Sequence, residues 1–185
     1  MVVDTHTLIW LFPIVFMIHD FEEIILGKPW LRKNAGEVKH LVEKRVPAFL
    51  AKQIGSVLDK TAAELSFPIS LIFGLTVLSA YLAVPHGAHG FFLLASGAFL
   101  LHGFMHLGQT LALRRYVPAV LTSALVVIPY GLALCGRLIH EGVVDLSGLL
   151  IYFLLAAILT VPFILVMHKA GGFLYQKAVR LLIDY

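Results

Sequence analysis

Apolar residues fill five long stretches of the chain, at about 5–27, 62–84, 89–113, 116–138 and 146–168. Each stretch has close to the about 20 residues that a helix needs to cross the hydrocarbon of a bilayer. None shows the alternation of apolar and polar residues that marks a strand of a membrane barrel. The pattern therefore predicts an all-α, polytopic membrane helix bundle with five transmembrane helices.

The segment between the first two stretches has a different, amphipathic pattern. Over about 36–58, apolar residues recur at three- and four-residue spacing, and most charged residues fall on the other side of the helical wheel. This predicts a helix that lies on the inner membrane surface and bends near Pro47. Two roles stay open for it: a passive interfacial anchor, or a lid over an opening between the spans.

The composition agrees with a membrane protein, because 59% of the residues are hydrophobic and 14% are charged, whereas a soluble domain is about a quarter charged. No linker-like tract divides the 185 residues, so a single membrane domain over 1–185 is expected. Asp4 and His6 stand where a secretory signal would carry Lys or Arg, which predicts that the first stretch remains as a span.

Lys and Arg are distributed unevenly over the predicted connections. Of the 14 basic residues, all but Arg137 fall between the first two stretches, between the third and fourth, or after the fifth. By the positive-inside rule, this predicts a multi-pass protein with its N-terminus outside and its C-terminus in the cytoplasm. The net charge of +3 then indicates contact with membrane lipid rather than nucleic acid. The sequence sets no oligomeric state.

Two of the apolar stretches carry ionisable side chains at helical spacing. His19, Glu22 and Glu23 share a face of the first, and His102 and His106 lie four residues apart on the third. At 1.5 Å per residue, His19 and His106 both lie about 12–13 Å from the cytoplasmic end of their spans. The two spans run in the same direction, so their polar faces can meet at one depth.

An acidic side chain at the bilayer centre costs about 2.5–3.5 kcal/mol, and two adjacent carboxylates also repel each other. Three groups could compensate Glu22 and Glu23: a bound cation, protonated histidines, or Arg115 at the start of the fourth stretch. Thr122 shares a helical face with Arg115, and Gln109 continues the polar face of the third stretch.

Three spaced motifs together resemble the HXXEE-domain family of small bacterial membrane proteins, and they cover most of the chain in order: His19-x-x-Glu22-Glu23, His102-x-x-x-His106 and Arg115-x-x-Pro118. The resemblance implies a location in the bacterial inner membrane and implies no settled reaction. The chain departs from the family pattern at His102, where the pattern has asparagine, and at Ala119, where it has glycine.

The residues themselves favour a metal-dependent membrane enzyme. Imidazoles with a carboxylate suit zinc or ferrous iron, which predicts a divalent metal site formed by His19, Glu22, Glu23, His102 and His106. A glutamate that is not a ligand can act as general base, so Glu22 and Glu23, with Arg115, are the candidate catalytic residues. Because the site lies inside the membrane, an amphiphilic, lipid-like or isoprenoid substrate is expected, with Arg115, Gln109 and Thr122 as its binding residues.

Three other functions stay open. A metal-free isomerase or cyclase could use Glu and His as acid and base. A proton-coupled transporter could use the same ionisable residues, although no polar path continues into the outer half of the spans. Alternatively, the cluster is a purely structural network that joins the first, third and fourth spans.

Overall fold

The computed structural model describes residues 4–182, except for the side chains at 49, 53, 54, 57 and 58. These residues form helices and turns, and no strand occurs among them. The all-α prediction is therefore confirmed for this part of the chain. In order, the elements are α1 (Thr5–Arg45), α2 (Ala48–Leu58), α3 (Ala62–His86), α4 (His89–Leu113), α5 (Val120–Thr122), the π-helical turn η1 (Ser123–Val127), α6 (Ile128–His140) and α7 (Leu146–Leu182).

Four helices of the described chain are long and apolar enough to cross a membrane: α3, α4, the continuous segment Val120–His140, and α7. The prediction of five such helices is therefore wrong. The difference lies in α1, where His19, Asp20, Glu22 and Glu23 interrupt the apolar run. The His19-x-x-Glu22-Glu23 motif thus lowers the hydropathy of α1.

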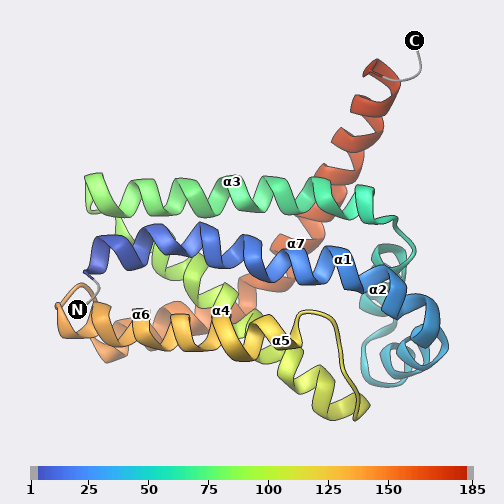
Figure 1. Cartoon of the computed structure of the whole chain (residues 1–185), viewed down its shortest axis with the longest axis horizontal. Helices are drawn as coiled ribbons and strands as arrows, with labels where there is room; N and C mark the ends of the chain where they lie inside the picture. Colours follow the sequence, from blue (N-terminus) through green and yellow to red (C-terminus); the bar gives the residue numbers. More distant parts are fainter. Residues whose placement is uncertain (1–3, 183–185) are drawn as a thin grey trace.

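The interfacial helix expected over about 36–58 is not a separate element. Its first part is the end of α1, which runs for 41 residues to Arg45, and its second part is α2. Pro47 lies between the two helices, where its ring is compatible with a helix start and not with the interior of one. Within α1, Pro29 does not end the helix, but the ribbon of α1 turns away from the bundle near its C-terminal end (Figure 1).

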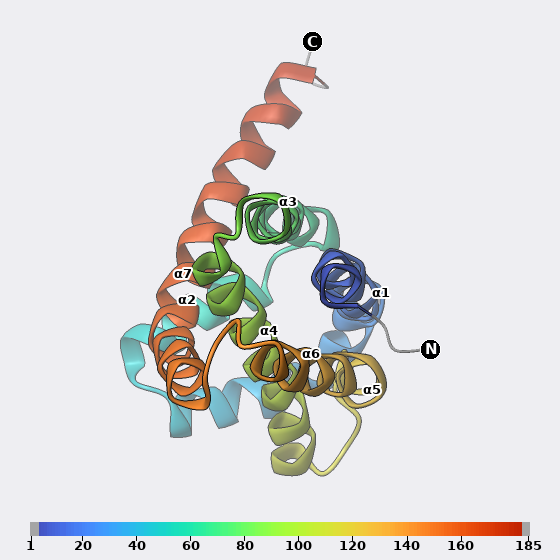
Figure 2. The ribbon, with the colours of Figure 1, turned by 90° about the vertical axis from the view of Figure 1, so that its left-hand side faces the viewer.

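The bundle is built around two long pairings, α1 with α3 and α3 with α7, and α4 packs against both α3 and α7. Figure 2 shows α1 and α3 end on, with α7 beside α3 and the C-terminal part of α7 leaving the bundle. A core of aromatic rings holds α1 against α4: Phe12 packs edge-on against Phe92 at 5.6 Å between ring centroids, and Phe16 lies 5.5 Å from Phe99. The polar residues of α1 begin directly after this core.

The connection from α4 to α5 brings the start of the next helix against α1. Arg114 and Ala119, at its two ends, both have left-handed backbone conformations, with φ of 50° and 69°. This conformation is uncommon in residues other than glycine, so the connection has a defined, irregular backbone path. The short helix α5 that follows ends at Thr122, directly before the π-helical turn η1, and π-helical turns are often found at functional sites.

Candidate metal centre

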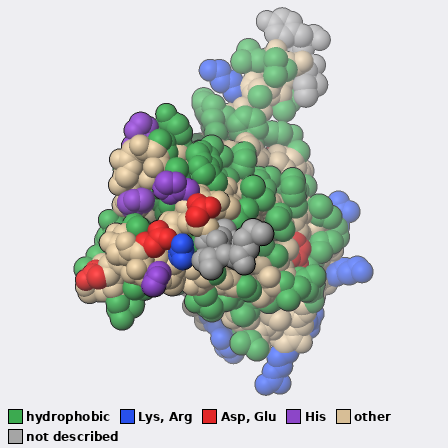
Figure 3. Space-filling model, turned by 60° about the vertical axis from the view of Figure 1, so that its left-hand side comes forward, with side chains coloured by type: hydrophobic (Ala, Val, Ile, Leu, Met, Phe, Trp, Pro, Cys, Tyr) green, Lys and Arg blue, Asp and Glu red, His purple; other side chains and the backbone are tan. Residues whose placement is uncertain are grey.

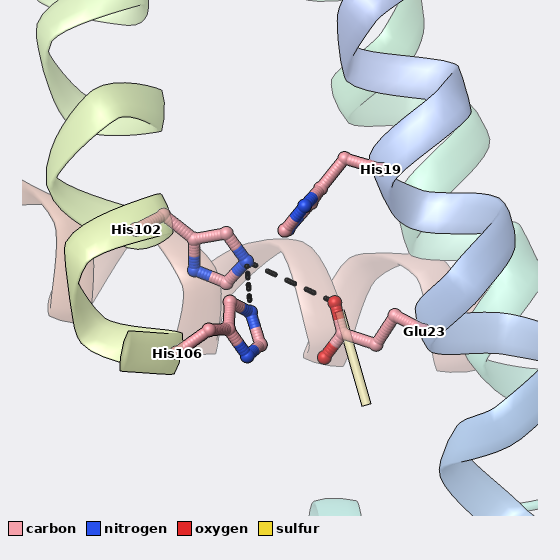
Figure 4. Close-up of side chains that lie close together, drawn as sticks. All are labelled: His19, Glu23, His102 and His106. Atoms are coloured by element: carbon pink, nitrogen blue, oxygen red, sulfur yellow. Dashed lines mark hydrogen bonds and ion pairs between the residues drawn. The ribbon is translucent and has the colours of Figure 1, made fainter. Parts of the chain in front are cut away.

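Two neighbouring helices place three imidazoles and one carboxylate together. His19 and Glu23 come from α1, and His102 and His106 come from α4 (Figure 4). One nitrogen or oxygen of each residue lies within 4.8 Å of the corresponding atom of every other. Residues four apart on a helix share a face, which is why each helix contributes its pair to the same space.

The atoms of the group are close enough to require a proton or a cation between them. The Nε2 atoms of His102 and His106 are 3.0 Å apart, and His102 Nε2 is 3.8 Å from Glu23 Oε2. The His19 ring centroid lies 5.2 Å from that of His102 and 5.1 Å from that of His106. Two neutral imidazole nitrogens at 3.0 Å share one hydrogen, or both donate lone pairs to one ion.

Burial is uneven across the group. His19 is fully buried and the exposed fraction of His106 is 4%, whereas the side chains of His102 and Glu23 are 22% and 40% exposed. The two buried histidines therefore form the closed side of the group. Glu23 and His102 form its accessible side.

A threonine and a second glutamate fix the orientation of His19. Thr122 Oγ1 lies 2.7 Å from Glu22 Oε2 and donates its hydrogen to that carboxylate. The same oxygen lies 3.1 Å from His19 Nδ1, so it accepts a hydrogen bond from the Nδ1 hydrogen. This leaves the lone pair on His19 Nε2, a buried atom that has no hydrogen-bond partner in the described chain. Polar groups that orient a histidine in this way are typical of metal sites.

Glu22 lies outside the group of four. Its carboxylate accepts hydrogen bonds from the Thr122 backbone N–H at 2.8 Å and from the Tyr116 hydroxyl at 2.5 Å. It thereby caps the first turn of the helix that starts at Val120. Partial burial and the Glu22 carboxylate raise the pKa of the Tyr116 phenol, which keeps this hydroxyl a hydrogen-bond donor. Thr122, one of the residues predicted to bind substrate, contacts Glu22 and His19.

Arg115 and Gln109, the other residues expected to bind substrate, do not join the group. Arg115 pairs with Glu37 Oε2 at 2.9 Å and donates to Asn34 Oδ1 at 2.7 Å, while Gln109 is exposed on α4. The neighbouring Trp30 donates to the Tyr116 carbonyl at 2.7 Å, so the distal part of α1 holds the α4–α5 connection in place.

We expect that Arg115→Ala changes stability little, because exposed ion pairs contribute about 0–1 kcal/mol. The Arg115 and Glu37 side chains are both about half exposed. Thermal unfolding of the purified variant should therefore stay close to that of the wild type, and its metal content should be unchanged. A complete loss of bound metal in this variant would contradict the assignment of Arg115 to a peripheral contact.

Sequence reasoning missed two residues with polar atoms in the same region. Asp20 is 6% exposed, and its Oδ2 atom is buried without a partner in the described chain. Tyr116 was missed because it lies 94 residues from Glu22. Its position directly after Arg115 in the third motif was the available signal.

These features define a class: a helical protein with four described helices long and apolar enough to cross a membrane, and a His/Glu group held between α1 and α4. A comparison with protein families matches residues 10–134 to the family described as protein of unknown function with HXXEE motif. The chain belongs to this family. The matched segment contains all four residues of the group and ends before α7. No match was found among curated proteins or among solved structures.

Proposed function

We propose that the protein is a metal-dependent integral membrane enzyme whose ion is held by His19, His102, His106 and Glu23. The observation that carries this proposal is the convergence of four ligand atoms within 4.8 Å. A tetrahedral zinc site with bonds of about 2.0–2.1 Å places its ligand atoms about 3.3 Å apart. The separations of 3.0 and 3.8 Å around His102 Nε2 bracket that value.

The ligand types favour zinc or ferrous iron over magnesium or calcium, because imidazole suits zinc and iron while the other two prefer oxygen. A catalytic ion polarises a carbonyl or phosphoryl oxygen, or activates a water molecule. Glu23 lies on the accessible side of the group, where a carboxylate can bind the ion or take a proton from the reacting group. Glu22 would act through Thr122 by orienting His19.

The surroundings support an amphiphilic, lipid-like or isoprenoid substrate. Large apolar side chains near the site are exposed on the outside of the bundle, among them Phe21, Met105 and Leu111. In a membrane these faces contact lipid, so a substrate dissolved in the bilayer reaches the site more easily than one dissolved in water. Free diffusion through water is not required for such a substrate.

The proposal also includes an orientation of the protein in the membrane. Figure 3 shows histidine and acidic side chains gathered at one end of the molecule, while most Lys and Arg side chains lie elsewhere. Most of these basic residues lie between Lys28 and Lys60, in the segment that connects the N-terminal part of α1 to α3, and in the connection from α4 to α5. By the positive-inside rule, the end of the bundle with these connections faces the cytoplasm, in the inner membrane of a bacterium. The proposed site would then open towards the cytoplasmic leaflet.

Elemental analysis of the purified protein tests the proposal. The wild type should carry about one zinc or iron ion per chain. His106→Ala should lose most of it, because His106 supplies a nearly buried ligand atom. His140→Ala is the matched control, since His140 is exposed at the far end of α6 and outside the group. A metal-free wild type, or unchanged metal in His106→Ala, would remove the metal from the proposal.

One alternative function has an observation of its own. His102 Nε2 and Glu23 Oε2 lie 3.8 Å apart, an ion-pair distance at which one bridging water could pass a proton between an acid and a base. A metal-free isomerase or cyclase would use this pair directly on an apolar substrate. The absence of metal from active protein would favour this alternative.

A further inference from the structure

The last turns of α7 form an arm, residues 173–182, that leaves the bundle. Figures 1 and 2 show this part of α7 rising away from α1, α3 and α6, which run alongside one another. A helix needs about 20 residues to cross the hydrocarbon of a bilayer, and α7 has 37. The arm is therefore a part of α7 that a span does not require.

Contacts with α3 hold the base of the arm in place. The Lys60 amino group, just before α3, donates to the His168 carbonyl oxygen of α7 at 2.9 Å. The Tyr175 ring lies against Phe67 in the first turns of α3, with 6.5 Å between ring centroids. Helix α3 is itself long and apolar enough to cross a membrane. The arm thus begins at the level where α3 ends, which in a bilayer is the membrane surface.

The arm has an apolar face beside a basic one. Leu174 and Leu181 lie seven residues apart on one face and are 39% and 54% exposed. Lys177 and Arg180 lie three residues apart on the neighbouring face, and both are exposed. The sequence of α7 contains no Asp or Glu that would offset these charges. Exposed apolar residues next to Lys and Arg are typical of helices that lie on a membrane surface.

We propose that the arm lies on the inner surface of the membrane and binds anionic phospholipid there. Leu174 and Leu181 enter the acyl region, and Lys177 and Arg180 contact the lipid phosphates. A second copy of the chain is a poorer partner, because its arm brings further positive charges against the first. The inference takes only the orientation of the chain from the proposed function and requires no metal.

Spin labelling of the full chain in lipid nanodiscs tests this proposal. Cys135 is the single cysteine of the chain, so Cys135→Ser gives a background in which Leu181→Cys or Gln176→Cys carries the nitroxide. Gln176 is the matched control position, because it is exposed on the basic side of the arm, four residues before Arg180. Oxygen relaxes a label in the bilayer, whereas a neutral nickel chelate relaxes a label in water. The nanodiscs contain phosphatidylcholine, alone or mixed with phosphatidylglycerol.

In the mixed lipid, we expect oxygen to dominate at position 181 and the nickel chelate at position 176. Lys177→Gln combined with Arg180→Gln should move the label at 181 towards water. Each basic residue near an anionic surface favours binding about fivefold, so the pair should lower the ratio of bound to free arm by on the order of 20–30-fold. Omitting phosphatidylglycerol should have the same effect. Lys39→Gln combined with Lys52→Gln removes two exposed charges from α1 and α2 and should leave the label unchanged.

Three results would overturn the inference. Equal access of the nickel chelate to both labels would place the arm in water. The same immersion of the label at 181 in both lipids would exclude recognition of anionic lipid. Spin–spin broadening that disappears on dilution with unlabelled protein would assign the arm to a second copy. Metal analysis of the same samples is independent: a metal-free protein with a bound arm removes only the metal site, and a metal-loaded protein with a free arm removes only this inference.

Discussion

Gly171→Ala should destabilise the protein strongly. A Cβ atom at this position would lie 2.7 Å from the Cδ and N atoms of Pro68 and 2.8 Å from its Cα. These are ring and backbone atoms, which cannot rotate away as a flexible side chain can, so α7 would have to move away from α3. Overpacking of a tight contact costs about 1–3 kcal/mol and occasionally more, and we expect the upper end of that range here.

The adjacent glycine provides the control. A Cβ atom at Gly172 would meet only the Lys60 amino group at 3.5 Å, which is an ordinary contact. At about 2–4 °C per kcal/mol for a protein of this size, Gly171→Ala should lower the Tm by on the order of 6–12 °C. Gly172→Ala should leave the Tm unchanged or raise it, because alanine favours a helix over glycine. Equal unfolding temperatures for the two variants would contradict the close crossing of α3 and α7.

Much of the candidate site could be predicted from the sequence because it depends on local geometry. The spacing of His102 and His106 fixes a shared face on any α-helix, and the same holds for His19 and Glu23. The depth of each pair follows from the rise per residue. The sequence does not predict that α1 and α4 face each other, since this depends on how the bundle packs. In the structure, the aromatic contacts of Phe12 with Phe92 and Phe99 bring the two helices together.

The limits of the helices were less predictable. Helix α7 was expected to end near 168 at the membrane surface, yet it continues to Leu182. Helix α1 continues past Pro29 to Arg45 instead of ending near 27. Hydropathy reports where a segment leaves apolar surroundings, and it does not report where the backbone stops being helical. For this reason the apolar stretches of α3 and α4 matched their helices closely, while those of α1 and α7 did not.

Contacts between distant segments could not be predicted at all. The Tyr116 bond to Glu22 and the Arg115 contacts with Asn34 and Glu37 join residues that are 94, 81 and 78 positions apart. They depend on the left-handed residues that turn the α4–α5 connection back onto α1. No spacing in the sequence encodes such a turn at Ala119, where a glycine would have been the usual signal.

The most direct consequence of this geometry is a difference between two adjacent glutamates. Both glutamates lie within one turn of His19, but neighbours on a helix point about 100° apart, so the two carboxylates reach different partners. The carboxylate of Glu23 is in the group of four, and that of Glu22 accepts hydrogen bonds from Tyr116 and Thr122. Glu23→Gln removes the charged ligand of the proposed ion, and we expect it to reduce metal affinity the most.

Glu22→Gln and Thr122→Val should have smaller effects on the ion. Both weaken the chain of hydrogen bonds that holds His19 Nδ1, and loss of such an orienting contact typically costs about 10–100-fold in metal affinity. At saturating metal the two variants should still bind the same amount of ion as the wild type. Competition of the purified proteins with a fluorescent zinc chelator gives each Kd, and elemental analysis at saturation gives the stoichiometry.

The expected order is therefore a large loss of affinity for Glu23→Gln and an intermediate, similar loss for Glu22→Gln and Thr122→Val. A similar loss in Glu22→Gln and Thr122→Val would show that both residues act by the same route. Thr122 has no acidic group, so it can affect the proposed ion only by orienting His19. Wild-type affinity in Glu23→Gln combined with loss of the ion in Glu22→Gln would reverse the roles of the two carboxylates. That result would require α1 to rotate about its axis and would also separate Glu22 from Thr122.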